Sequence, residues 1–261
     1  MTTAERSITF REREFKGSRL RCLLLTSDTP NKVAAFLNSL AAPHAQVTVE
    51  DRWAPRGFLD PDEAKLGETA GFLSEADRTT LTNWWLAQPG AANTPNWDLV
   101  SKCRINNSDG LVLVEAKAHE GELSDDRCGA TNQENLEQIK KALAEANVAW
   151  NALASGAALS ANSHYQLSNR FAFAWKLATM GIPVVLIYLG FLDAHEIDYR
   201  GRILLRDHTQ WRRRVLAQSK GIVPETVWDK TFDVGGTPLT VVIKSAVVGV
   251  HANPANDGVH N

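Results

Sequence analysis

Cysteine is scarce in this 261-residue sequence, and no apolar run is long. The three cysteines are widely spaced and form no Cys-x-x-Cys pair, which argues against a disulfide framework or a thiolate zinc site and fits a reducing cytoplasm. No apolar run reaches the roughly 18 residues of a membrane span. The opening MTTAERSITFREREFKG lacks the apolar core of a signal peptide. We therefore expect a cytoplasmic protein with no membrane partner.

Several common catalytic motifs are also missing. The chain has no Gly-x-x-x-x-Gly-Lys-Ser/Thr phosphate loop, no Gly-x-Gly-x-x-Gly fingerprint, no Gly-x-Ser-x-Gly elbow and no His-Glu-x-x-His. Nucleotide hydrolysis, dinucleotide chemistry and serine esterase chemistry thus lose their usual sequence signals. Charge of one sign is not in excess either, because the net charge is −2. A nucleic-acid-binding surface would need its basic residues gathered along one groove.

The composition is that of a soluble globular protein, with 44% apolar and 22% charged residues. The length suits one decorated domain. We predict an α/β fold in which helices flank a central mixed β-sheet. The expected parts are a β-α-β-like N-terminal extension, a core, a C-terminal helix and hairpin, and a disordered tail, over residues 1–58, 59–192, 193–250 and 251–261 respectively.

Periodicity and turn signals place the expected elements along the chain. A charged arm over residues 1–17 precedes them. The expected strands cover residues 19–26, 46–53, 97–103, 111–118, 184–191, 226–234 and 238–249. The expected helices run from Pro30 to about Leu40, within the acidic segment 60–88 with Asp60 and Ser74 as caps, after a Thr131/Glu134 capping box, and over 164–180 and 207–219.

The strand over 111–118 ends in an unusual way. Its side chains alternate, so Glu115 and Lys117 extend the row of Leu111 and Leu113 on one face. A carboxylate and an ammonium at the end of a buried strand cost desolvation free energy unless something pairs with them. Either a plain ion pair or a bound metal ion beside the lysine meets that need.

A second carboxylate precedes this strand. If residues 104–110 turn the chain back, Asp98 comes alongside Glu115. Two carboxylates and the backbone carbonyl of Ala116 then form a hard oxygen site of the kind that suits Mg²⁺ or Mn²⁺. Such an ion polarises a phosphate and lowers the pKa of a bound water. Lys117 would orient the attacking water in preference to acting as a free base, because the neighbouring carboxylate opposes a lowered lysine pKa.

The chain here resembles the PD-(D/E)XK nuclease superfamily. The matching residues are Asp98 in Trp97-Asp98-Leu99-Val100 and Glu115-Ala116-Lys117 after Leu-Val-Leu-Val, within residues 60–192. The order of helix, two hairpin strands, helix and a strand after Pro183 is also similar. Trp97 stands where the name-giving proline would be. The resemblance implies a restriction-endonuclease-like core and a metal-dependent nuclease, commonly one acting on DNA.

Two other interpretations stay open. A nuclease-like scaffold without catalysis would bind nucleic acid or a protein partner. In a structural or regulatory protein, Glu115 and Lys117 would merely pair. The hairpin near the C-terminus also offers an interface for a homodimer.

Four further residues are weaker candidates. Glu68 would add a carboxylate to the metal, in competition with Glu63 and Glu75. Gln166 and Arg170 lie in the apolar arc of their expected helix, where substrate phosphate, the metal-site carboxylates or structural hydrogen bonds would partner them. His119 continues the row of Glu115 and Lys117 and would touch phosphate or water, although a histidine there is more often a plain surface residue.

Overall fold

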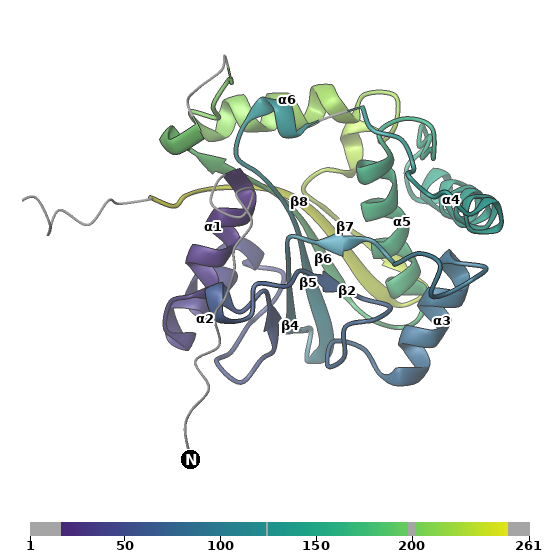
Figure 1. The fold of residues 1–261 in the computed structure, drawn as a ribbon, viewed down its shortest axis with the longest axis horizontal. Helices are drawn as coiled ribbons and strands as arrows, with labels where there is room; N and C mark the ends of the chain where they lie inside the picture. Colours follow the sequence, from purple (N-terminus) through teal and green to yellow (C-terminus); the bar gives the residue numbers. More distant parts are fainter. Residues whose placement is uncertain (1–16, 124, 198–201, 250–261) are drawn as a thin grey trace, which may run out of the picture.

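The structure is a computed structural model that describes residues 17–123, 125–197 and 202–249. The expected arm over residues 1–17 and the expected tail over 251–261 therefore fall almost wholly outside the described residues. A central β-sheet lies between two groups of helices (Figure 1). None of the described helices combines the length and the apolar character needed to span a bilayer.

The main sheet is mixed, as expected. Within the described residues it has six strands in the order β1-β4-β5-β6-β8-β7. The neighbouring strands β5, β6 and β8 are parallel, and the other pairs are antiparallel. The strands are β1 (Trp53–Ala54), β4 (Leu99–Ile105), β5 (Ser108–Lys117), β6 (Val184–Leu192), β7 (Lys230–Val234) and β8 (Thr237–Val247); β2 (Ala64–Lys65) and β3 (Asn96–Trp97) form a separate pair.

Helices cover both faces of this sheet (Figure 1). One face carries α1 (Gly17–Thr26) and α2 (Pro30–Ala41). The other carries α3 (Glu75–Trp85), α4 (Gln133–Leu153), α5 (Tyr165–Thr179) and α6 (His208–Ser219). Short 3₁₀ turns are η2 (Gly57–Leu59), η3 (Glu120–Glu122), η4 (His195–Ile197) and η5 (Glu225–Val227). The predicted α/β class with a mixed sheet flanked by helices is confirmed.

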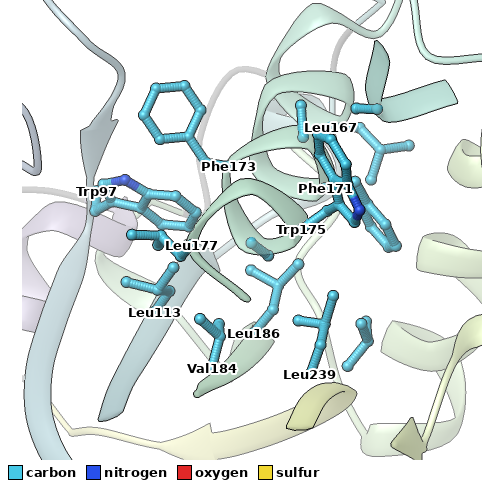
Figure 2. Packing of buried hydrophobic residues seen from close by; sticks show 14 of the residues in the cluster. Trp97, Leu113, Leu167, Phe171, Phe173, Trp175, Leu177, Val184, Leu186 and Leu239 are labelled. Atoms are coloured by element: carbon cyan, nitrogen blue, oxygen red, sulfur yellow. The ribbon is translucent and has the colours of Figure 1, made fainter. Parts of the chain in front are cut away.

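Strand β5 is buried on both faces. Leu111 and Leu113 pack in the cluster on the α5 side, whereas Val112 and Val114 pack against α1 and α2. Figure 2 shows Leu113 with side chains of β6 and α5 in the first cluster. Continuous apolar sequence is typical of a strand covered on both sides, and this prediction is confirmed. Glu115 and Lys117 consequently extend the row that faces α5.

A tight turn sets the register of the β4–β5 hairpin. Asn106 and Asn107 have φ of 47° and 65°, the left-handed conformation of a two-residue type I′ turn, which asparagine tolerates well. Ile105 therefore pairs with Ser108, and Leu99 pairs with Val114. One step further along the same register, position 98 lies opposite position 115.

The N-terminal elements differ from the sequence prediction. The predicted strand over 19–26 is wrong, because those residues form α1. Leu20 and Leu23 are buried at helical spacing on its inner face. The predicted strand over 46–53 is also wrong except at Trp53, since Gln46 makes only an isolated bridge and Thr48 closes a turn with Asp51.

Two helix starts are also corrected. Within residues 60–88 only α3 is helical, and Ser74 caps it as predicted by accepting from Asp77 N at 3.1 Å. Asp60 caps no α-helix and instead follows η2. The N-cap of α4 is Asn132 rather than Thr131, with its Oδ1 accepting from Asn135 N at 2.9 Å.

The later elements agree closely with prediction. Helices α2, α5 and α6, strand β6 and the hairpin with its Gly235-Gly236 turn are confirmed. The first hairpin strand, predicted from residue 226, begins only at Lys230, because Glu225–Val227 form η5. Strand β7 lies at one edge of the sheet. The homodimer interface expected at this hairpin stays a prediction.

Candidate functional site

Asp98 lies just before β4, beside the end of β5. Its Oδ2 accepts a hydrogen bond from the backbone N–H of Ala116 at 2.7 Å. Burial raises the pKa of the Asp98 carboxyl well above its usual value, and the nearby negative charge of Glu115 raises it further. The hairpin thus brings the two predicted carboxylates close enough to repel each other.

Glu115 is buried, with 1% of its surface exposed. One carboxylate oxygen accepts from Lys117 Nζ, and the other accepts from Arg170 Nε at 2.5 Å. Burial alone would raise the pKa of Glu115, but the positive charges of Arg170 and Lys117 outweigh it and hold the pKa below its usual value. Glu115 is therefore an ionised carboxylate with a cation on each oxygen.

Lys117 is the second buried charge on the β5 row. Its Nζ donates to Glu115 and to Gln166 Oε1, the latter at 2.9 Å. Burial lowers the pKa of a lysine, yet the charges of Glu115 and Asp98 outweigh that effect and raise it above its usual value. Lys117 therefore stays an ammonium, which suits the orienting role expected for it and not the role of a base.

Helix α5 provides the fourth charged side chain of the cluster, Arg170. Besides Glu115, its guanidinium donates to Asn169 Oδ1 at 2.7 Å and to the backbone carbonyl of Asn96 at 2.6 Å. It also lies 4.5 Å from the centre of the Trp97 ring, within cation–π range. Arg170 and Gln166 do fall on the helix face that meets the sheet, and their partners are the site residues themselves.

The glutamates that precede the β4–β5 hairpin have different hydrogen-bond partners. Glu68 binds Thr94, accepting from its N at 2.9 Å and its Oγ1 at 2.7 Å. Glu63 instead bonds Arg19 and accepts from Asn96 Nδ2 at 3.1 Å. The negative charge of Glu63 also contributes to the raised pKa of Asp98. Of the competing glutamates, Glu63 is therefore the one whose charge reaches the cluster.

His119 follows β5 and borders a cavity beside the cluster. Its Nδ1 accepts from Gly121 N at 3.0 Å, and its Nε2 lies 3.5 Å from Glu122. Burial lowers the pKa of His119, although Glu122 opposes this. The cavity has a volume of about 410 Å³ and is lined by Gly17, Ser18, Arg19, Glu63, Asn96, His119, Glu122, Ile197 and Arg202.

Some residues of the cluster were not singled out from the sequence. Tyr188 pairs with Glu115 in the parallel register of β5 and β6. It carries the only polar side-chain group in Val184–Leu192, and that was the available signal. Asn169 is buried and accepts a hydrogen bond from Arg170. Nothing in the local sequence indicated the part played by the Asn96 carbonyl.

The donor set for a cation is modest. Across the described ranges, no group of three or more His, Cys, Asp and Glu side chains has an arrangement suited to a metal ion. Asp98, Glu115 and the Ala116 carbonyl remain the predicted oxygen donors. In a ladder, a residue directs its N–H and C=O to the same edge. Because the Ala116 N–H meets Asp98, its carbonyl faces that side too.

Another cavity lies at the opposite end of β5. It has a volume of about 560 Å³, and Arg52, Lys102 and Gly110 are among the residues that line it. Asp51 and Asp109 line it as well, so its charge is mixed. None of the site residues above borders it.

Comparisons with protein-family models, curated proteins and solved structures found no match for this chain.

Proposed function

We propose that this protein is a metal-dependent nuclease of the PD-(D/E)XK type that hydrolyses nucleic-acid phosphodiester bonds, with DNA as the expected substrate. The observation that carries the proposal is the approach of Asp98 to β5, where its carboxylate meets the Ala116 N–H at 2.7 Å beside Glu115 and Lys117. Strand β6 runs parallel to β5 after two helices, which supports a restriction-endonuclease-like core.

The residues fit Mg²⁺ or Mn²⁺ on one condition. Two carboxylates and a carbonyl form the hard oxygen set that these ions take, with water or phosphate oxygens completing the shell. Burial and the negative charge of Glu115 raise the pKa of Asp98, and a divalent cation beside its carboxylate would oppose both effects. Both Glu115 oxygens already accept from basic groups, so an ion must either use a second lone pair on one of these oxygens or displace its basic partner.

The chemistry divides among these residues. A divalent cation held there would polarise the phosphate and lower the pKa of the attacking water. Lys117, which keeps its proton, orients that water and offsets the negative charge of the transition state. The water oxygen forms a bond to phosphorus while the bond to one sugar oxygen breaks. One water hydrogen ends on that sugar hydroxyl, and the other leaves from the new phosphate terminus to solvent.

The weaker candidates take supporting roles in this proposal. Arg170 holds Glu115 through its Nε, and its remaining hydrogen bonds go to Asn169 and Asn96; it is a positioning residue. Gln166 holds Lys117 at 2.9 Å. His119 borders the 410 Å³ cavity with Arg19, where substrate phosphate would enter. Glu63 replaces Glu68 as the additional carboxylate.

A second candidate has its own observation. The complete pairing of Glu115 by Lys117 and Arg170 favours a nuclease-like scaffold that binds nucleic acid or a protein without cleaving it. A buried carboxylate with two cations needs no metal ion for its stability. The two candidates differ in one property, because only the nuclease must bind Mg²⁺ or Mn²⁺ at Asp98.

Cleavage assays test the enzyme directly. Purified protein is incubated with single- and double-stranded DNA in Mg²⁺ and in Mn²⁺, beside Glu115→Gln and Lys117→Met, whose folding is checked by circular dichroism. We expect cleavage by the parent and a loss of about 100-fold or more in each variant, equal to roughly 3 kcal/mol of transition-state stabilisation. Glu137→Gln on the exposed side of α4 is the matched control and keeps parental activity.

The outcomes separate the two candidates. Absence of cleavage, or variants as active as the parent, would refute the nuclease. Titration of Mn²⁺ into the parent and into Asp98→Asn then decides what remains. Binding that disappears in Asp98→Asn supports a metal centre, whereas no binding by the parent favours the scaffold.

A further inference from the structure

A small cavity lies between the cluster and the tyrosine on β6. Its volume is about 20 Å³, and one water molecule needs about 10–15 Å³. Polar walls come from Lys117, Glu122, Gln166, Tyr188 and Gln218, and apolar walls come from Leu123, Leu167 and Val215. The space can thus hold a single water molecule and offers it enough polar partners.

Tyr188 supplies the strongest reason to place a water there. The residue is 4% exposed, and among the described residues no protein group hydrogen-bonds its buried Oη. An unsatisfied buried hydroxyl is costly, and such groups in native proteins are satisfied by ordered water when protein does not suffice. The ring is fixed by Trp228, whose centre lies 5.1 Å away in an edge-on arrangement. The hydroxyl therefore has a set position.

Lys117 faces the same cavity with a donor to spare. An ammonium has three N–H donors, and within the described chain Glu115 and Gln166 take two of them. The third is left to donate to an oxygen in the cavity. Tyr188 is the register partner of Glu115 on the neighbouring strand, so its side chain lies beside the same charged row.

We propose that Tyr188 and Lys117 together hold one ordered water molecule in this cavity, and that this water supplies the oxygen that attacks the phosphate. The second half rests on the proposed nuclease function. Tyr188 is then a positioning residue that fixes the oxygen next to Lys117. The reaction balance is the one given above, because the water is the nucleophile already named. Glu122 lines both this cavity and the 410 Å³ cavity, so one side chain borders both the water position and the expected path of substrate.

The water position is tested without activity. High-resolution crystal structures of the parent and of Tyr188→Phe are compared, together with their thermal unfolding midpoints. We expect a water within hydrogen-bonding distance of Tyr188 Oη and Lys117 Nζ in the parent, its loss in the variant, and a lower midpoint for the variant. No such water, or a higher midpoint on removal of the hydroxyl, would overturn the water site, since deleting an unsatisfied group is neutral or stabilising.

The role in attack is tested by kinetics. Tyr188→Phe should lower kcat by about 10- to 100-fold, in keeping with a misplaced reactant, and leave KM and Mn²⁺ affinity unchanged. Tyr165→Phe is the matched control, because Tyr165 is not among the residues that line the 20 Å³ cavity; its kcat should equal that of the parent. An unchanged kcat in Tyr188→Phe refutes the attacking role. A parent that cleaves nothing refutes the proposed nuclease and this role together, while the crystallographic result still decides the water site.

Discussion

Two buried arginines each hold a glutamate in this protein, and the surroundings of the two carboxylates differ. Arg21 of α1 is 1% exposed and binds both oxygens of Glu196, whose side chain is 21% exposed. Arg170 of α5 binds a single oxygen of Glu115, which is 1% exposed. The second oxygen of Glu115 goes to Lys117. In the Arg21–Glu196 pair the carboxylate borders solvent and the arginine binds both of its oxygens, whereas the Arg170–Glu115 pair belongs to a larger cluster.

The difference separates a structural pair from a site. A fork-to-fork pair such as Arg21–Glu196 places one cation on both oxygens of one carboxylate and requires no further charge. Beside Glu115 lie the half-buried Asp98, the buried Lys117 and two neutral polar side chains, and each costs desolvation free energy to the extent that it is buried. Asp98 has a pKa well above the usual value. An excess of buried, perturbed groups is typical of functional sites.

Removal of each arginine should produce the largest difference in stability between the two pairs. Arg170→Met should lower the unfolding free energy by about 3–5 kcal/mol, because it leaves a buried carboxylate with one cation fewer. Arg21→Met should cost about 1 kcal/mol, because Glu196 turns to water. Urea denaturation of the parent and both variants measures the two losses. Equal losses would mean that the two pairs play the same structural part.

The affinity for Mn²⁺ should also differ between variants of the two arginines, but by a smaller free energy. If an ion must replace a basic partner of Glu115, Arg170→Gln should bind Mn²⁺ on the order of tenfold more tightly than the parent, about 1.4 kcal/mol. Arg21→Gln should bind it as the parent does, since Glu196 is not part of the donor set. Isothermal titration calorimetry under conditions where all three proteins are folded gives the affinities. Weaker binding by Arg170→Gln would show that the guanidinium supports the ion rather than competing with it.

The sequence predicted the elements whose signals are local and unambiguous. Strand β5 and strand β6 are continuous apolar runs, and the β7–β8 hairpin has a Gly-Gly turn. The segment over 19–26 has a short apolar run that fits a strand or a helix equally well. Whether this segment folds as a strand or as a helix depends on tertiary contacts, among them the bond of Arg21 to a glutamate 175 residues away. No window along the chain contains that information.

The site divides in the same way. Alternation along β5 and the turn at Asn106 were enough to predict that Asp98, Glu115 and Lys117 converge. The hydrogen bond from Arg170 to Glu115 spans 55 residues, and the one from Arg170 to Asn96 spans 74. Both bonds therefore depend on how α5 packs against the sheet. Glu68 was preferred over Glu63 on the assumption of a helix, but residues 61–74 contain β2 and turns. Helical phase therefore had no bearing on which glutamate approaches Asp98.

The smallest expected effect concerns the pH dependence of stability in metal-free protein. Burial raises the pKa of Glu196, but its hydrogen bond to Arg21 outweighs this and leaves the pKa below its usual value. The pKa of Asp98 is raised by burial and by Glu115. The folded protein therefore holds the Asp98 proton to higher pH than the unfolded chain, and this group lowers the unfolding free energy as pH rises above about 4. The contribution of Glu196 has the opposite sign, since it is present above about pH 4.3 and is lost as pH falls through the folded-state pKa.

Two isosteric variants reveal the opposite signs. Asp98→Asn should be more stable than the parent near pH 7, with the advantage shrinking toward about pH 4. Glu196→Gln should be less stable near pH 7 by about 1 kcal/mol, and its deficit should persist down to about pH 4.3 and shrink only below that pH. Urea denaturation in chelator-treated buffers between about pH 3 and 8 measures both differences. If Asp98→Asn is instead destabilised increasingly as pH rises, the Asp98 carboxylate is stabilised in the fold like Glu196, and the contrast between the two acids is lost.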